Sequence, residues 1–109
     1  MRQYEIWWAE LPAPVGRRPV LLLTRTPALR YLSKCIVAEV TSAVRGIEVE
    51  VDLGRPEGLP RSCVANLDNV HVVPIRSLVR RVGALAAARH IEVKRALGHA
   101  LAWPELMGA

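Results

Sequence analysis

The sequence predicts a small, mainly β protein in which a curled antiparallel sheet or barrel is followed by a C-terminal helix. Short apolar runs are separated by turns that contain proline or glycine, a pattern typical of strands. Near Leu85 the apolar spacing changes to that of an amphipathic helix, which is predicted to continue to Ala102. The 109 residues suffice for one hydrophobic core, so residues 1–109 are expected to form a single domain.

The first two strands are predicted at Tyr4–Leu11 and Pro19–Thr24. Pro12 and Pro14 end the first strand, and consecutive tryptophans within it, Trp7 and Trp8, should face opposite sides of the sheet. The second run is short, apolar and preceded by Gly16-Arg17-Arg18, which indicates a strand buried on both faces. Two arginines therefore lie where a loop becomes a rigid element.

The next elements are an irregular basic segment, Arg25–Lys34, and a third strand, Cys35–Thr41. A two-residue period places Glu39 and Thr41 on the same face of that strand. After a turn at Arg45-Gly46, residues 47–52 alternate strictly between apolar and acidic side chains. This alternation predicts a fourth strand with its acidic side in solvent.

The remainder of the chain is predicted as a loop, three short strands and the helix. The loop covers Leu53–Arg61, and the strands cover Ser62–Asn66, Val70–Val73 and Val79–Val82, with a helical turn at Ile75–Leu78. The helix lacks an obvious capping residue at its start and is ended by Pro104.

The charge of the chain favours an anionic partner. Fifteen basic and ten acidic residues give a formal net charge of +5, and every basic residue except Lys34 and Lys94 is an arginine. Guanidinium groups bind oxyanions through paired hydrogen bonds, which suits nucleic acid or an acidic protein segment. A simple compositional bias toward arginine is the alternative explanation.

Several kinds of site are not indicated by the sequence. Cys35 and Cys63 are far apart, without a C-x-x-C pattern, and are expected to be buried apolar residues. His90 and His99 fall on roughly opposite faces of the helix, and His71 has no neighbours at ligand spacing, so no metal and no cofactor are expected. No nucleophile elbow, P-loop or dinucleotide fingerprint is present.

No membrane association is expected either. The N-terminus lacks the apolar region of a signal peptide, and no apolar run is long enough to cross a bilayer. The cytoplasm is the expected location.

A set of segments in the same order resembles one known family. Glu5–Leu11, the G-x-R-P stretch within Gly16–Thr24, and Val37–Ser42, with its Thr41, are similar to successive segments of MazF/PemK-type toxins. These toxins are the ribonuclease components of bacterial toxin–antitoxin pairs. Residues 66–85 and the C-terminal helix also follow the layout of the family, so the resemblance covers nearly the whole chain.

The resemblance implies a curled antiparallel barrel of the CcdB/PemK plasmid-maintenance toxin type that forms a homodimer. It also implies sequence-preferring, metal-independent cleavage of single-stranded RNA, which inhibits growth, with Arg18 and Thr41 as the catalytic pair. The ribose 2′-hydroxyl would attack the neighbouring phosphate and leave a cyclic phosphate and a 5′-hydroxyl. Arg18 would stabilise the added negative charge, or donate a proton to the leaving oxygen, because an arginine stays protonated. Thr41 would position the phosphate or relay a proton, and the general base is left open.

Further RNA contacts follow from position and chemistry. Arg17, Arg25 and Lys34 would contact the RNA backbone, and Tyr31 could stack on a base. Solvated side chains on loops are the alternative for all four. The protein partner implied by the resemblance is an antitoxin whose acidic, disordered segment occupies the basic groove.

Two departures from the family pattern are visible. Pro14-Val15 leads almost directly into Gly16, where members often have a longer loop with a Gly-x-Glu element, and this bears on the cleavage sequence and the grip on the substrate. Tyr4 stands where a glycine is usual. Arg18 and Thr41 are unaffected.

Two alternatives belong to other functional classes. The related CcdB-type toxins share the architecture but bind gyrase and cut nothing, and their C-terminal motif is not evident in Leu101–Pro104. The other alternative is a non-catalytic basic module that binds nucleic acid.

Overall fold

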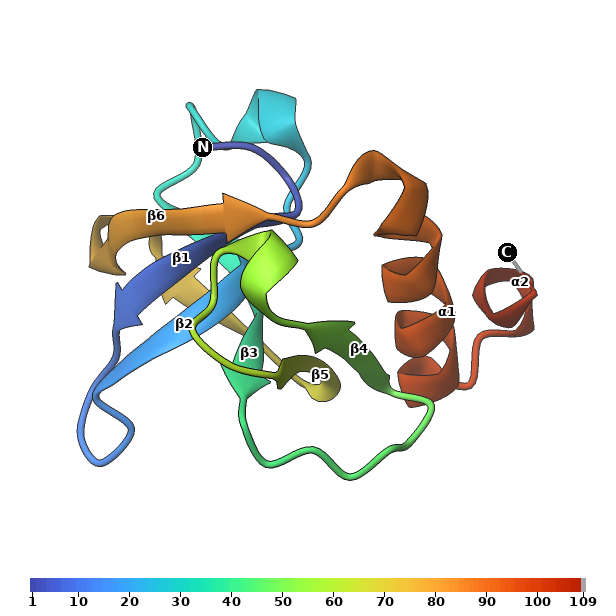
Figure 1. Cartoon of the computed structure of the whole chain (residues 1–109). Helices are drawn as coiled ribbons and strands as arrows, with labels where there is room; N and C mark the ends of the chain where they lie inside the picture. The colour runs from blue at the N-terminus through green and yellow to red at the C-terminus, as the bar shows by residue number, and fades with distance from the viewer. Residues whose placement is uncertain (109) are drawn as a thin grey trace.

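The computed structural model describes residues 1–108, which form one curled six-stranded sheet with a helix packed against it (Figure 1). Neighbouring strands pair antiparallel in the order β4-β5-β3-β2-β1-β6. The strands are β1 (Glu5–Glu10), β2 (Arg17–Leu22), β3 (Lys34–Thr41), β4 (Glu50–Leu53), β5 (Cys63–Pro74) and β6 (Leu78–Ala84). The helices are α1 (His90–Leu101) and the short α2 (Pro104–Met107), and 3₁₀ turns occupy η1 (Thr26–Ala28), η2 (Arg55–Glu57), η3 (Ile75–Ser77) and η4 (Ala87–Arg89).

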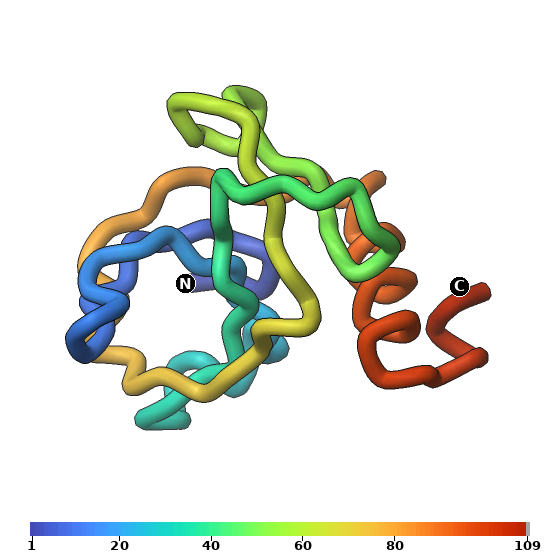
Figure 2. The backbone as a smooth tube through the Cα atoms, turned by 90° about the horizontal axis from the view of Figure 1, so that it is seen from below, coloured from blue at the N-terminus to red at the C-terminus, as the bar shows by residue number. Residues whose placement is uncertain are grey.

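The sheet curls until its two edges approach each other, and α1 lies outside the curl (Figure 2). The edges β4 and β6 do not pair directly; instead, η2 packs against β6. A β-carbon at Gly83 would overlap the carbonyl oxygen of Glu57, and one at Gly58 would overlap that of Val82. Gly58 also has a φ of 93°, which side chains rarely tolerate. Two glycines therefore permit the closure of the barrel.

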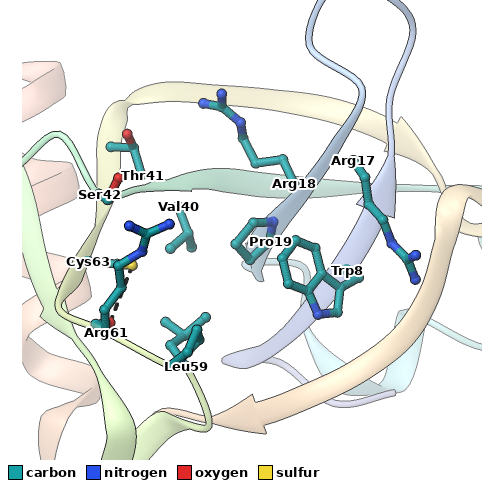
Figure 3. A pocket seen from close by; sticks show the side chains of 11 residues that line it. Trp8, Arg17, Arg18, Pro19, Val40, Thr41, Ser42, Leu59, Arg61 and Cys63 are labelled. Atoms are coloured by element: carbon teal, nitrogen blue, oxygen red, sulfur yellow. Dashed lines mark hydrogen bonds between the residues drawn. The ribbon is translucent and has the colours of Figure 1, made fainter.

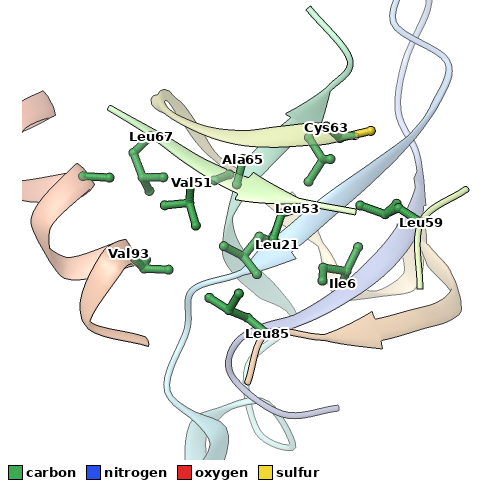
Figure 4. Close-up of a cluster of buried hydrophobic side chains, with 13 residues drawn as sticks. Ile6, Leu21, Val51, Leu53, Leu59, Cys63, Ala65, Leu67, Leu85 and Val93 are labelled. Atoms are coloured by element: carbon green, nitrogen blue, oxygen red, sulfur yellow. The ribbon is translucent and has the colours of Figure 1, made fainter. Parts of the chain in front are cut away.

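The core is divided between two clusters on the two faces of the curled sheet. One lies between the sheet and α1 and includes Ile6, Leu21, Val51 and Val93 (Figure 4). The other includes Val20, Leu22 and Val37. Val20, Leu21 and Leu22 are all fully buried, which confirms that the second predicted strand is buried on both faces. Burial of each such side chain contributes about 1.5–3 kcal/mol, so this strand anchors the residues that precede it.

Helix α1 is fixed at its first turn by polar and aromatic contacts. Arg89 Nη2 donates to the backbone carbonyl of Asp52 at 2.7 Å, and its guanidinium also binds the carboxylates of Glu92 and Glu57. The ring of His90 lies 3.9 Å from that of Tyr4. No side chain caps the N-terminus of α1, as the sequence indicated, and these contacts position the helix instead.

Tyr4 occupies the left-handed region of backbone conformation, with a φ of 70°. This explains why a glycine would be the ordinary choice at this position, because a β-carbon makes that conformation costly. The side chain packs against the core beside α1, and burial raises the pKa of its hydroxyl. The stacking on His90 therefore offsets part of the backbone cost.

The predicted fourth strand is wrong for residues 47–49. The strand begins only at Glu50, and Ile47 is exposed. The Glu50 carboxylate accepts hydrogen bonds from the backbone N–H groups of Arg45, Gly46 and Ile47, which holds these residues in a turn. The alternation of apolar and acidic residues is typical of a strand, but here its first half forms a turn that is bound by a carboxylate.

The two strands predicted at Ser62–Asn66 and Val70–Val73 are instead one strand, β5. Ala38 of β3 pairs with Val70, whereas its neighbour Glu39 pairs with Asn66, so residues 67–69 form a bulge within the strand. The Asn66 side chain accepts the backbone N–H of Asp68 and stabilises the bulge. The bulge bends β5 and increases the curl of the sheet.

Smaller differences affect the ends of elements. Strand β2 begins at Arg17, two residues before the predicted start, so both arginines lie in the strand rather than in the loop. Helix α1 begins at His90, because residues 87–89 form a 3₁₀ turn. Both cysteines are free and buried as predicted, and burial raises the pKa of the Cys35 thiol. Among residues 1–108, no helix has the length and apolar character needed to span a membrane.

Candidate functional site

A pocket of about 250 Å³ opens where β2 begins and β3 ends (Figure 3). It is lined by residues of β1, β2 and β3, by the loop after η2 and by the first residue of β5. Its lining residues are Trp8, Arg17, Arg18, Pro19, Val40, Thr41, Ser42, Leu59, Pro60, Arg61 and Cys63. Three of these carry guanidinium groups and none carries a carboxylate, so the pocket favours an anion.

The pairing of β2 with β3 explains why Arg18 and Thr41 meet. Val20 pairs with Glu39, and continuing this antiparallel register by two residues places Arg18 opposite Thr41. Residues opposite each other share a face of the sheet. Pro19 lies between, and it has no N–H to extend the ladder, so the strands can separate here and open the pocket. Figure 3 shows both side chains extending from neighbouring strands on the same side of the sheet.

The hydroxyl of Thr41 is oriented by its own turn. Thr41 Oγ1 accepts a hydrogen bond from the backbone N–H of Ala43 at 3.1 Å. A hydroxyl that accepts in this way can still donate its own proton. Thr41 can therefore offer a directed hydrogen bond to an oxyanion in the pocket.

Arg18 is hydrogen-bonded to the buried carboxylate of Glu39. Its Nη1 donates to Glu39 Oε1 at 3.1 Å, and Glu39 Oε2 lies 2.9 Å from His71 Nε2. The Glu39 side chain is 11% exposed, whereas that of Arg18 is 37% exposed and reaches the pocket. His71 Nε2 makes no hydrogen bond, so this second contact is an ion pair when the imidazole is protonated.

Arg17 lies at the outer edge of the pocket. Its guanidinium lies 5.7 Å from the centre of the Trp8 ring, within the range of a cation–π interaction. Trp8 is half-buried, and Trp7 on the opposite face packs against a core cluster and donates to Glu5 at 3.0 Å. The two tryptophans therefore face opposite sides of the sheet, as predicted.

Arg61 is a residue of the pocket that the sequence did not single out. It extends from the loop after η2 toward Val40 and Ser42 (Figure 3). The position of this loop is set by the close approach of η2 to β6, which Gly58 and Gly83 permit. The sequence offered one indication of a basic site here, a glycine- and proline-rich loop flanked by Arg55 and Arg61. No local pattern indicates that Arg61 and Arg18 line the same pocket.

The other predicted RNA-binding residues lie elsewhere. Arg25 and Lys34 line a second pocket of about 360 Å³, and Tyr31 lines neither pocket and is 81% exposed. Lys34 and Thr41 are the first and last residues of β3, so their α-carbons are roughly 20 Å apart. The structure thus brings Arg17, Arg18 and Thr41 together and separates them from Arg25, Tyr31 and Lys34.

Metal-ligating side chains are dispersed in the described chain. Among residues 1–108, no group of three or more His, Cys, Asp or Glu side chains is arranged to hold a metal ion. The most distinctive feature of the main pocket is that three arginine residues and Thr41 contribute to its lining.

Comparisons with known proteins agree on one family. Residues 2–101 match the model of the PemK-like, MazF-like toxins of type II toxin–antitoxin systems. The chain is 42% identical over 86 residues to a Mycobacterium tuberculosis protein named probable endoribonuclease MazF5, covering 78% of each chain. It is 39% identical over 90 residues to probable endoribonuclease MazF2 of the same species, covering 82% of this chain and 86% of the relative.

Solved structures support the same relationship. The fold is similar to that of the M. tuberculosis toxin MazF-mt6, with a TM-score of 0.85 and 34% identity over 90% of this chain and 96% of the other. A mycobacterial endoribonuclease in complex with its cognate antitoxin has a TM-score of 0.82 over 95% of this chain and 97% of the other. Because the two sequences are only 21% identical, this second similarity shows a shared fold alone.

Proposed function

Because the chain belongs to the PemK-like, MazF-like toxins of type II toxin–antitoxin systems, we propose that it is an endoribonuclease that cleaves single-stranded RNA without a metal ion. The observation that carries the proposal is the juxtaposition of Arg18 and Thr41 in a pocket lined by three arginine residues. The relatives are named probable endoribonucleases, which favours this activity over gyrase binding and over a non-catalytic module.

The proposed reaction is an internal transfer at one phosphate of the RNA. The 2′-oxygen forms a bond to phosphorus while its proton passes to a base, and the bond from phosphorus to the 5′-oxygen breaks. The 5′-oxygen takes up a proton, so the products are a 2′,3′-cyclic phosphate and a 5′-hydroxyl. Negative charge on the equatorial oxygens increases in the transition state. Fixed cationic donors aimed at that charge lower the barrier.

The pocket residues fit these requirements. Arg18 is held in place by Glu39 through one N–H, which leaves other donors of its guanidinium for the phosphoryl oxygens. Thr41 adds a directed hydroxyl, and Arg61 adds a further cation at the pocket wall. Arg17 is placed to bind a neighbouring phosphate, with Trp8 beside it as a surface for stacking.

Arg25, Tyr31 and Lys34 are proposed to contact RNA remote from the cleaved bond. The separation of roughly 20 Å between the ends of β3 means that only a strand extended over several nucleotides could reach both regions. These side chains would therefore contribute to binding, through phosphate contacts and base stacking, rather than to the chemical step.

The proposed partners are a second copy of the chain and an antitoxin. Similar solved structures include an endoribonuclease in complex with its cognate antitoxin and MazE–MazF complexes from Deinococcus radiodurans. An acidic, disordered antitoxin segment would suit the guanidinium-lined pocket, because the charges are complementary. The proposed location is the cytoplasm, where the RNA substrate is found.

The proposal can be tested with purified protein, a long single-stranded RNA and a chelator. We expect cleavage at a limited set of sequences, with 5′-hydroxyl product ends. Thr41→Val should reduce the rate by about 10–100-fold, because it removes one hydrogen bond to a charged group. The fold should be unchanged. Arg76→Ala, which removes an exposed arginine of η3 outside the pocket, is the matched control and should cleave normally. Intact RNA, or 5′-phosphate ends, would contradict the mechanism.

A further inference from the structure

Glu39 is an acidic side chain buried beside a pocket whose own lining carries positive charge. It lies in β3, and its side chain is 11% exposed. It does not line the pocket, so a bound phosphate would meet Arg18 rather than Glu39. A buried carboxylate is costly unless it is paired, and a negative charge here also weakens the attraction of the pocket for RNA. We therefore looked to the contacts of the Glu39 carboxylate for a benefit that offsets these costs.

The contacts of Glu39 connect the three strands at the middle of the sheet. Strand β3 lies between β2 and β5, and Glu39 receives Arg18 from one neighbour and His71 from the other. Each carboxylate oxygen has its own partner, at 3.1 Å and 2.9 Å. The carboxylate is thus hydrogen-bonded on one side and has an imidazole nitrogen within ion-pair distance on the other. Its position is set by the centre of the sheet.

The consequence for Arg18 is a loss of freedom before substrate binds. An arginine side chain has about 2 kcal/mol of rotamer entropy, which would otherwise be lost on binding or in the transition state. Arg18 and Glu39 lie in diagonal positions on paired strands, since Val20 pairs with Glu39. The bond to Glu39 fixes one edge of the guanidinium, and the other donors can face the pocket.

We propose that Glu39 is a positioning residue that preorganises Arg18 for the chemical step, with His71 contacting the second oxygen of the carboxylate. The inference rests on the proposed ribonuclease function and extends it to residues outside the pocket lining. Preorganised donors act mainly on the transition state, so Glu39 should affect the rate of cleavage more than the binding of RNA.

The test compares Glu39→Gln with Glu5→Gln in single-turnover cleavage of an RNA with a mapped site. Glu5 is the matched control, because it is equally buried and bound to an arginine, Arg81, that lies outside the pocket. We expect Glu39→Gln to slow cleavage by about 10-fold, because it removes one charge-assisted hydrogen bond to Arg18. Glu5→Gln should leave the cleavage rate unchanged. Binding is measured separately, with the same RNA carrying a 2′-deoxy substitution at the cleaved nucleotide. Glu39→Gln should bind this probe as tightly as wild type or more tightly.

The outcomes separate the possible failures. If wild type cleaves and Glu39→Gln matches it in rate, the positioning role is wrong and the proposed function stands. A Glu39→Gln variant that only binds RNA more weakly would also overturn the role. If wild type leaves the RNA intact, both proposals fail.

A double variant protects the test against a general loss of structure. In an Arg18→Ala background, Glu39→Gln should cause no further loss of rate, because the residue it positions is gone. Equal losses in both backgrounds would show that Glu39 acts through the fold and would overturn the proposal. His71→Gln should slow cleavage about 2–5-fold, less than Glu39→Gln, because it removes only a contact to the positioning residue.

Discussion

Two buried glutamates of the barrel bind arginines in different ways. The Glu5 and Glu39 side chains are 10% and 11% exposed, and each forms an ion pair with an arginine of a neighbouring strand. Glu5 accepts hydrogen bonds from three donors, which are Arg81 Nε, the Trp7 ring and the backbone N–H of Arg2. Arg81 is 52% exposed and lines no described pocket, whereas Arg18 lines the main one.

The difference shows that the same chemical pair can stabilise a fold or orient a functional group. At Glu5 the carboxylate gathers donors from β1 and β6 and fixes the N-terminal strand. At Glu39 the carboxylate holds a cation that still has donors directed elsewhere. We therefore expect changes at the first pair to alter stability, and changes at the second to alter cleavage.

The largest contrast is expected from a conservative exchange of each arginine. Arg18→Lys keeps the charge but loses the guanidinium fork, so it should slow cleavage by about 10–100-fold. Arg81→Lys should change the free energy of unfolding by less than about 0.5 kcal/mol, because an exposed ammonium can still pair with Glu5. Cleavage rates and urea denaturation of both variants measure the contrast. Equal activity of the two variants would remove the distinction between the pairs.

The next effect concerns stability alone. Glu5→Gln should lower the free energy of unfolding by about 1–2 kcal/mol, since it weakens hydrogen bonds to a buried acceptor. The rate of RNA cleavage by the folded variant should stay at the wild-type value. Urea denaturation followed by circular dichroism gives the first quantity. An unchanged denaturation midpoint would mean that Glu5 does not stabilise the fold.

A smaller, pH-dependent effect follows from the pKa of Glu5. Burial alone would raise this pKa, but the hydrogen bonds from Arg81, Trp7 and the Arg2 backbone outweigh burial and lower it below the ordinary value of 4.5. A carboxyl whose pKa is lowered by folding stabilises the protein above its unfolded pKa, and this contribution disappears as the pH falls through the folded pKa.

The stability difference between wild type and Glu5→Gln should therefore be largest near neutral pH. It should decline below about pH 4.5 and become small once Glu5 is protonated in the folded state. Urea midpoints of the two proteins at a series of pH values provide the measurement. A difference that grows as the pH falls would contradict the assignment.

The sequence was informative where local pattern decides structure. The buried strand after Arg17-Arg18 needed only an apolar run with a proline at its start, and the same-face relation of Glu39 and Thr41 needed only the two-residue period. The opposite case is residues 47–49, where a carboxylate that binds three backbone N–H groups overrides an alternating pattern. Propensity could not report that contact, because it depends on the conformation of the turn.

The candidate site was only partly predictable for a similar reason. Arg18 and Thr41 could be paired through the family resemblance, whereas Arg61 reaches the pocket because Gly58 and Gly83 let η2 pack against β6. The meeting of Glu39 with His71 depends on the pairing of β3 with β5 around a bulge. Neither arrangement has a local signature, since both depend on contacts between residues that lie far apart in the sequence.

The central claim is that Arg18 acts in the chemical step of RNA cleavage, whereas the similarly paired Arg81 does not. The most direct measurement is the single-turnover cleavage rate of Arg18→Ala and Arg81→Ala on one RNA in the presence of a chelator. We predict that Arg18→Ala is slower than wild type by about 10²–10³-fold, as for the loss of a donor to a developing oxyanion, and that Arg81→Ala cleaves normally. Comparable rates for the two variants, or undiminished cleavage by Arg18→Ala, would contradict this account.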